Sequence, residues 1–185
     1  GDSHGKISGV VTSTEGQPLA GVTVTAQDIS AVTLEDGTYT LLDVSPSENI
    51  VVKFSKQGFA KNYTTTTIQS WETVSSNASL LEANGFSVID SQQINTVNIE
   101  GTRVSFLENS FVNSDGSLYT GEVNVQVTHV DPSTSEILGA PTDLTAIAKQ
   151  SGDSTAKDTT SVSQLVSYGM VDIGLFGSDG QELNI

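Results

Sequence analysis

The catalytic chemistry open to this chain is limited first by its histidines and cysteines. It has two histidines, His4 and His129, and no cysteine among 185 residues. A Ser-His-Asp triad would need His129, but Asp131 follows too closely in sequence to orient the imidazole without a special turn. Two distant histidines do not make a zinc site, and the lack of cysteine excludes thiolate zinc, disulfides and a cysteine nucleophile. Because the 22 acidic residues show no spacing that pairs two carboxylates for glycoside hydrolysis, we predict that the protein is not an enzyme.

Calcium is the one cofactor that the acidic residues could bind. Asp-Gly dipeptides begin at Asp36, Asp115 and Asp179, and Ca²⁺ takes oxygen ligands from such loops. None of the three has the Asp-x-Asp-x-Asp-Gly spacing of an EF-hand, and hairpin geometry alone explains an Asp-Gly pair. We therefore interpret all three as structural turns. If Ca²⁺ binds, we expect Asp115 or Asp131 to be a ligand.

The aromatic residues suggest a second kind of site, one that binds sugars. Trp71 is the single tryptophan, and an amphipathic aromatic face can stack on a sugar ring. A carbohydrate-binding platform would need Trp71, Tyr63 and Tyr119 exposed on one face. The competing interpretation is that Trp71 packs at the edge of a domain or at a domain boundary. Rings buried in separate cores would argue against the platform.

The charge of the chain excludes some partners. Seven basic against 22 acidic residues give a formal net charge of −15. Phosphate neutralisation needs a basic surface, so we predict no binding to nucleic acid and none to an anionic membrane surface. No apolar run approaches the ~20 residues of a membrane-spanning helix, and we predict no direct membrane insertion.

The elements that must position these residues have the pattern of β-strands. The segment Val22–Gln27 alternates apolar and polar side chains, which is the period of two of a half-buried strand. The Asp-Gly pair at Asp36 separates Ala31–Glu35 from Thr38–Val44 and indicates a hairpin. Ile50–Phe54 is a further β-branched run. Helical periodicity fits none of these segments, and we predict an all-β protein.

The first half of the chain resembles the carboxypeptidase regulatory-like domain. The resemblance rests on the motifs Ile7-x-Gly9-x-Val11, Gly16-x-Pro18-Leu19-x-Gly21-Val22-x-Val24, Thr33-x-x-Asp36-Gly37-x-Tyr39-x-Leu41 and Lys56-x-Gly58-Phe59. It covers Gly5 to about Glu82 and implies a seven-stranded, transthyretin-like sandwich. The family implies a non-catalytic module, found beside peptidases, outer-membrane transporters and surface proteins.

Composition and turn signals divide the chain into two β-sandwich domains in tandem. We expect a flexible tail over residues 1–4, the first sandwich over 5–82, a linker over 83–93 and a second sandwich-like domain over 94–185. The second half predicts short strands, which we place at Phe86–Ile89, Thr96–Ile99, Arg103–Leu107, Val123–Thr128, Leu144–Ala148 and within Leu165–Phe176. Residues 151–161 are polar, with no apolar side chain larger than alanine, and predict a loop.

The second half resembles the extracellular regions of the astroprincin and cartilage intermediate layer protein families, and of surface proteins from the Bacteroidota. The motifs are Gly101-Thr102-x-Val104, Asp115-Gly116-x-x-Tyr119-Thr120-Gly121-x-Val123-x-Val125, Asp131-Pro132, Pro141-x-Asp143-Leu144 and Ser167-Tyr168-Gly169-Met170. Related sequences tend to read Pro-Gly-Asp where this chain has Pro141-Thr142-Asp143. The pattern tends to continue past Ile185, so we expect a longer protein.

Together these features predict a secreted or cell-surface protein of two sandwiches that spaces domains or presents a binding surface to a surface protein or glycan. A lipid anchor upstream of Gly1, at the outer membrane or in the periplasm, fits this setting. One alternative is a carbohydrate-binding module of a surface glycan-utilisation system. Another, an accessory domain of a peptidase, rests on the family association alone.

Overall fold

The computed structural model describes residues 3–129 and 171–185. These residues contain thirteen β-strands and no helix, so the predicted all-β class is confirmed. No helix in these two ranges is long and apolar enough to cross a membrane. The chain divides into two compact units, one ending at Glu82 and the other beginning at Ala83.

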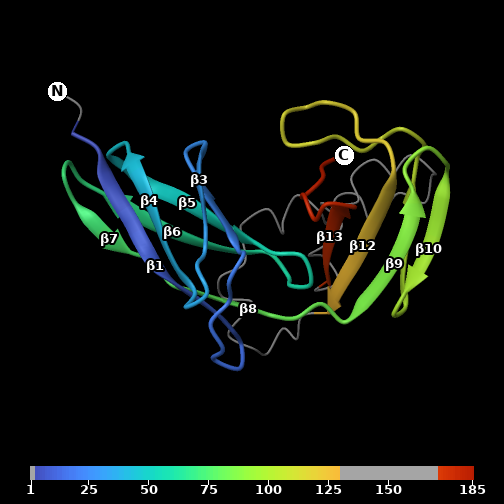
Figure 1. The fold of residues 1–185 in the computed structure, drawn as a ribbon, viewed down its shortest axis with the longest axis horizontal. Helices are drawn as coiled ribbons and strands as arrows, with labels where there is room; N and C mark the ends of the chain where they lie inside the picture. Colours follow the sequence, from blue (N-terminus) through green and yellow to red (C-terminus); the bar gives the residue numbers. More distant parts are fainter. Residues whose placement is uncertain (1–2, 130–170) are drawn as a thin grey trace. The chain divides into compact units, whose positions relative to one another are not determined.

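The first unit consists of two sheets (Figure 1). One has the strand order β3-β2-β5-β6, and in the other β1 lies between β4 and the consecutive strands β7 and β8. The strands are β1 (Gly5–Ser13), β2 (Thr23–Ala26), β3 (Ile29–Val32), β4 (Thr38–Val44), β5 (Ser47–Ser55), β6 (Asn62–Ile68), β7 (Thr73–Ser75) and β8 (Ala78–Leu80). Because β7 and β8 both pair in parallel with β1, they are two halves of one interrupted strand. The unit therefore has the seven strands that the family resemblance implies.

The apolar side chains of the alternating runs meet between these two sheets. The core consists of Ile7, Val11, Val22, Val24, Ala26, Tyr39, Leu41, Val44, Ile50, Val52, Phe54, Ile68, Ala78 and Leu80. Burying one large apolar side chain contributes about 1.5–3 kcal/mol, so the sheets are held mainly by this layer. The rings of Tyr39 and Phe54 meet edge to face with their centroids 5.7 Å apart, an arrangement that aromatic pairs favour.

The three Asp-Gly hairpins share one turn geometry, which the turn from Ser13 to Gln17 also has. Loops of three residues connect Leu34 to Thr38, Asn113 to Ser117 and Gly177 to Gln181, and in each the third loop residue is a glycine with φ between 80° and 86°. This is a type I turn followed by a left-handed residue. The three Asp-Gly pairs therefore have the structural role that we predicted for them.

In the part of the second unit that the structure describes, one sheet has the strand order β13-β12-β9 and another consists of β10 and β11. The strands are β9 (Gly85–Asp90), β10 (Asn95–Ile99), β11 (Thr102–Phe106), β12 (Glu122–His129) and β13 (Val171–Gly177). The core includes Ile89, Ile99, Val104, Phe106, Phe111, Tyr119, Val123, Val125, Val127, Ile173, Leu175 and Leu183. The inward side chains of β12 are all valine, which suits a buried strand.

One expected boundary differs from the structure. Residues 83–93 were expected to form a linker, but they contain β9, which pairs with β12 along its whole length. The short apolar run Phe86–Ile89 was enough to form a strand, because β12 offers a complementary edge. The predicted strand Leu144–Ala148 and the predicted loop 151–161 lie outside the described residues.

Candidate binding surfaces

Trp71 lies in a tight turn between β6 and β7, and its side chain is 75% exposed. The Glu72 N–H donates to the Gln69 carbonyl at 3.1 Å, and the Gln69 N–H donates to the Glu72 carboxylate at 2.8 Å. Trp71 itself has a φ of 64°. Residues other than glycine and, at times, asparagine or aspartate adopt this left-handed backbone conformation at a cost of about 1–2 kcal/mol. The turn therefore holds the indole in solvent at a cost to the stability of the fold.

The structure does not give Trp71 the two aromatic partners that we expected. Tyr63 lies on β6, half-buried and opposite Lys53 of β5. Tyr119 is only 7% exposed and belongs to the core of the second unit. Its hydroxyl donates to the Glu122 carbonyl at 2.7 Å and accepts the Ser178 N–H at 3.0 Å. Tyr119 therefore cannot present its ring to a sugar, and the predicted platform of three rings is wrong.

The carboxylate of Asp115, the first of the two expected calcium ligands, is hydrogen-bonded within its own turn. Its Oδ1 accepts the Ser117 N–H at 2.9 Å and the Ser117 hydroxyl at 2.5 Å. Asp36 makes the same two bonds to Thr38, at 3.0 and 2.6 Å. These two hydrogen bonds hold the pKa of each carboxyl below its ordinary value of 3.8, and the bond from the hydroxyl has the larger effect.

Beyond this turn, the described ranges offer no assembled metal centre. Within residues 3–129 and 171–185, no three His, Cys, Asp or Glu side chains come together as a metal-binding group. Asp131, the second expected ligand, lies outside these ranges. Calcium binding through Asp115 or Asp131 thus stays a prediction.

His129, the histidine that a triad would need, is engaged locally. Its Nε2 lies 3.0 Å from the Glu100 carbonyl, and its backbone N–H donates to the Asn84 side-chain oxygen at 3.2 Å. Both partners are in the loops that precede β9 and follow β10. These contacts tie the end of β12 to its neighbours, which is a structural role.

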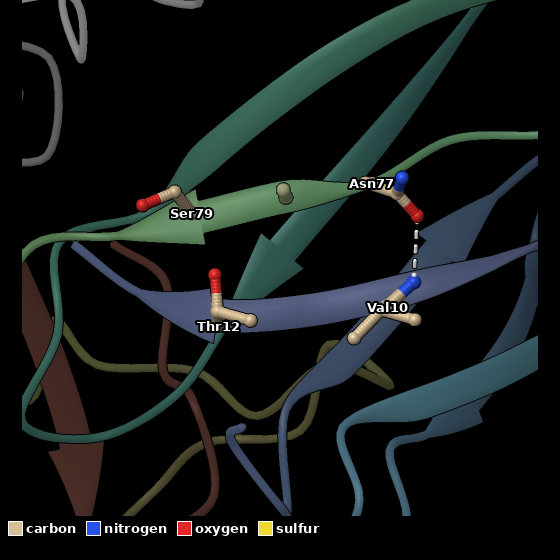
Figure 2. Close-up of a pocket in the computed structure, with 5 residues that line it drawn as sticks. Val10, Thr12, Asn77 and Ser79 are labelled. Carbon is tan, nitrogen blue, oxygen red and sulfur yellow. Dashed lines mark hydrogen bonds between the residues drawn. The ribbon is translucent and has the colours of Figure 1, made fainter. Parts of the chain in front are cut away.

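The sequence analysis missed a shallow hollow of about 410 Å³ beside the interruption between β7 and β8. The Ser76 N–H donates to the Ser8 carbonyl at 2.8 Å, and the Asn77 side chain then replaces a backbone partner by accepting the Val10 N–H, also at 2.8 Å. Figure 2 shows this bond, with Thr12 and Ser79 further along the two strands. The lining residues are Val10, Thr12, Asn77, Ala78 and Ser79. None of the five lining side chains is charged, and the Asn77 side-chain oxygen is already bonded to the Val10 N–H.

One residue in the sequence signals this interruption. Gly9 lies in the middle of β1, and any Cβ there would overlap the carbonyl group of Ser76. A glycine inside a strand often marks a bulge or a close approach of backbone. The neighbouring segment could not be identified from sequence, because nothing near Gly9 says that Ser76 is its partner.

The described fold of the first unit defines it as a transthyretin-like β-sandwich. Residues 6–81 match the sequence model of the carboxypeptidase regulatory-like domain. The first unit is therefore a carboxypeptidase regulatory-like domain, and the resemblance drawn from the motifs is confirmed. The resemblance of the second half to astroprincin, cartilage intermediate layer protein and Bacteroidota surface proteins stays a prediction.

Among solved structures, the chain is similar to parts of several proteins. One is a mutant type II cohesin–X-dockerin complex from Acetivibrio cellulolyticus, with 19% identity over 42% of this chain and 58% of that chain and a TM-score of 0.35. Another is a streptococcal ancillary pilin, with 9% identity over 67% of this chain and 53% of that chain and a TM-score of 0.34. The matches thus cover little more than half of either solved chain. No curated protein matches the chain.

Proposed function

We propose that this chain is a non-catalytic module of a secreted or cell-surface protein and that it presents a binding surface to a partner outside the chain. The observation that carries the proposal is the display of Trp71, which is 75% exposed on a left-handed backbone. A residue held at a cost to stability indicates a role other than folding. The carboxypeptidase regulatory-like domain at residues 6–81 supports the non-catalytic part of the proposal, because the family resemblance brings no catalytic motif.

The surroundings of Trp71 favour a glycan as the partner. The same turn carries the amide of Gln69 and the carboxylate of Glu72, which accepts the Gln69 N–H, and both side chains are exposed. Stacking on an aromatic face together with a few polar contacts is a common way to orient a small polar ligand. The hydrogen bonds within the turn fix the backbone before binding, which lowers the entropy cost of association.

A protein partner is the second candidate. Trp and Tyr are enriched among residues that dominate protein–protein affinity, and a single exposed tryptophan serves this role as well as it serves a sugar. We also propose a cell-surface location, a lipid anchor at the outer membrane or in the periplasm, or a role as an accessory domain of a peptidase. These proposals rest on the kinds of protein in which this family is found. Spacing between neighbouring domains is compatible with all of them.

A glycan-array screen of the full chain, compared with Trp71→Ala, tests the proposal. Leu34→Ala is the matched control, because Leu34 is also a large exposed apolar residue beside a turn of the first unit. Binding that is lost in Trp71→Ala and kept in Leu34→Ala would establish that the partner is a glycan and that Trp71 contacts it. Glycan binding that survives Trp71→Ala would move the site elsewhere. If no glycan binds, pull-downs from the source cell surface with the same two variants test the protein reading.

A further inference from the structure

β9 is an edge strand with an exposed apolar face. It pairs with β12 on one side, and among the described residues no strand pairs with it on the other. Phe86 and Val88 lie two residues apart on β9, so they point to the same face, and their side chains are 64% and 58% exposed. β10 does not extend this sheet: it pairs with β11, and its Ile99 side chain packs over Gly85 on the core side.

Among the described residues, no strand or bridge pairs with the backbone of β9 at these two residues on the side away from β12. Just past the strand, the Ser91 N–H donates to the Gly121 carbonyl of the β12 side at 3.0 Å, while the Asp90 carbonyl points away and accepts the Asn95 side-chain amide at 2.9 Å. Backbone groups alternate in direction along an antiparallel pair. The N–H and C=O groups of Phe86 and Val88 therefore point away from β12, as those of Asp90 do.

The charges beside this open edge are of one sign. Asp90 lies directly opposite Glu122 on β12, and both are exposed. Like charges in this arrangement destabilise a sheet. The residues opposite Phe86 and Val88 are the neutral Gln126 and Asn124. The edge thus presents an apolar pair followed by a carboxylate pair.

We propose that β9 accepts an added strand from a partner polypeptide, namely an extended segment with alternating apolar side chains followed by Lys or Arg. Strand addition satisfies the free backbone groups of an edge, and its side chains give specificity. The apolar side chains of the segment would cover Phe86 and Val88, and its cation would relieve the repulsion between Asp90 and Glu122. A second copy of this chain fits less well, because it would bring the same carboxylates and a further charge of −15 to the interface. The proposal concerns the second unit and does not depend on Trp71.

Amide NMR spectra of the ¹⁵N-labelled full chain test this proposal with a synthetic probe, the capped peptide Thr-Val-Thr-Val-Thr-Lys. We expect millimolar peptide to shift the amide signals of Phe86 and Val88 more than those of β5, whose two edges are both paired. A peptide with Glu in place of Lys should bind more weakly, and one with Pro in place of the second Val should not bind, because proline cannot donate to the ladder. Equal binding of the Lys and Glu peptides, or no shift at β9, would overturn the proposal.

Two matched variants separate strand addition from a general effect of charge. Val88→Lys places a cation on the open edge and should abolish binding of the basic peptide, as lysine on natural edge strands prevents pairing. Val51→Lys makes the same change at a valine that is 53% exposed on β5, and it should leave binding unchanged. Glu122→Gln should weaken binding about threefold at low salt, the size of one cross-strand charge pair. Equal losses in Val88→Lys and Val51→Lys, or β9 shifts that grow with protein concentration without peptide, would contradict the proposed partner.

Discussion

The phenol hydroxyl of Tyr39 on β4 donates a hydrogen bond to the backbone carbonyl of Ser76 at 2.5 Å. Ser76 lies between the end of β7 at Ser75 and the start of β8 at Ala78. The bond therefore crosses under β1 and satisfies a carbonyl that the interrupted strand would otherwise leave unpaired. The Ser76 hydroxyl also lies 2.6 Å from that of Thr64 on β6, so both sheets hold the interruption in place.

We expect Tyr39→Phe to lower the free energy of unfolding by about 1–3 kcal/mol, because it removes the donor and leaves a buried carbonyl unsatisfied. The ring remains, so its contact with Phe54 is kept. Urea unfolding followed by circular dichroism measures the change. Thr64→Val, which removes a less buried hydroxyl partner of Ser76, is the matched control and should cost less. Equal stability of Tyr39→Phe and the wild type would show that the bond contributes nothing.

The same residue predicts a loss of stability at alkaline pH. Burial raises the pKa of Tyr39 from 10.0 to about 12. A raised folded pKa means that the unfolded chain releases its proton first, so this contribution is complete below pH 10.0 and is lost progressively toward pH 12. Unfolding midpoints in urea across this range should fall more steeply for the wild type than for Tyr39→Phe. Parallel slopes for the two proteins would contradict the assignment.

Gly9→Ala tests the close approach at the interruption itself. The added Cβ would overlap the Ser76 carbonyl, which is backbone and can move only if β7 and β8 shift away from β1. We expect a loss of about 1–3 kcal/mol, typical of overpacking. Val10→Ala, at the neighbouring and partly exposed position, should change stability far less. A neutral Gly9→Ala would show that the edge strand adjusts freely.

The sequence predicted those features of the fold that depend on local pattern. Val22–Gln27 alternates, and its apolar members are buried, while the Asp-Gly pair after Glu35 forms the expected hairpin turn. Pairing between distant segments was not predictable in the same way. Gly9 indicates that some backbone comes close, but only the folded chain brings Ser76 there.

The candidate site was predicted less well than the fold. Tyr119 and Trp71 both lie close to turns in the sequence, yet one is buried and the other exposed. What separates them is long-range: the Tyr119 hydroxyl reaches Ser178, 59 residues away. Within residues 3–129 and 171–185 the Trp71 indole has no such distant hydrogen-bond partner, and it remains in solvent. Burial of single aromatic residues depends on tertiary contacts, which periodicity does not encode.

The turn carboxylates predict a specific titration. Hydrogen bonds from Ser117 lower the pKa of Asp115 below 3.8, so we expect Ser117→Ala to bring the pKa of this carboxyl back toward that value. Carboxyl ¹³C shifts followed over acidic pH measure it, with Asp36, held by Thr38, as the internal control that should not move. Because the folded pKa is lowered, the stability contributed by this turn is present above pH 3.8 and is lost as the pH falls further. An unchanged Asp115 titration in Ser117→Ala would mean that another group lowers its pKa.

Replacing Trp71 by asparagine should separate the stability of the fold from its binding function. Asparagine tolerates the left-handed conformation that Trp71 adopts at a φ of 64°, so we expect Trp71→Asn to raise the free energy of unfolding by about 0.5–1 kcal/mol. Because the indole is exposed, little packing is lost in exchange. The same variant should lose whatever partner binds this turn, which would give a more stable but inactive protein. Urea unfolding followed by circular dichroism, independent of the lost tryptophan fluorescence, measures the stability, and Leu34→Asn serves as the surface control. A less stable Trp71→Asn would mean that the indole packs on the first unit, and the turn would then hold it for folding and not for binding.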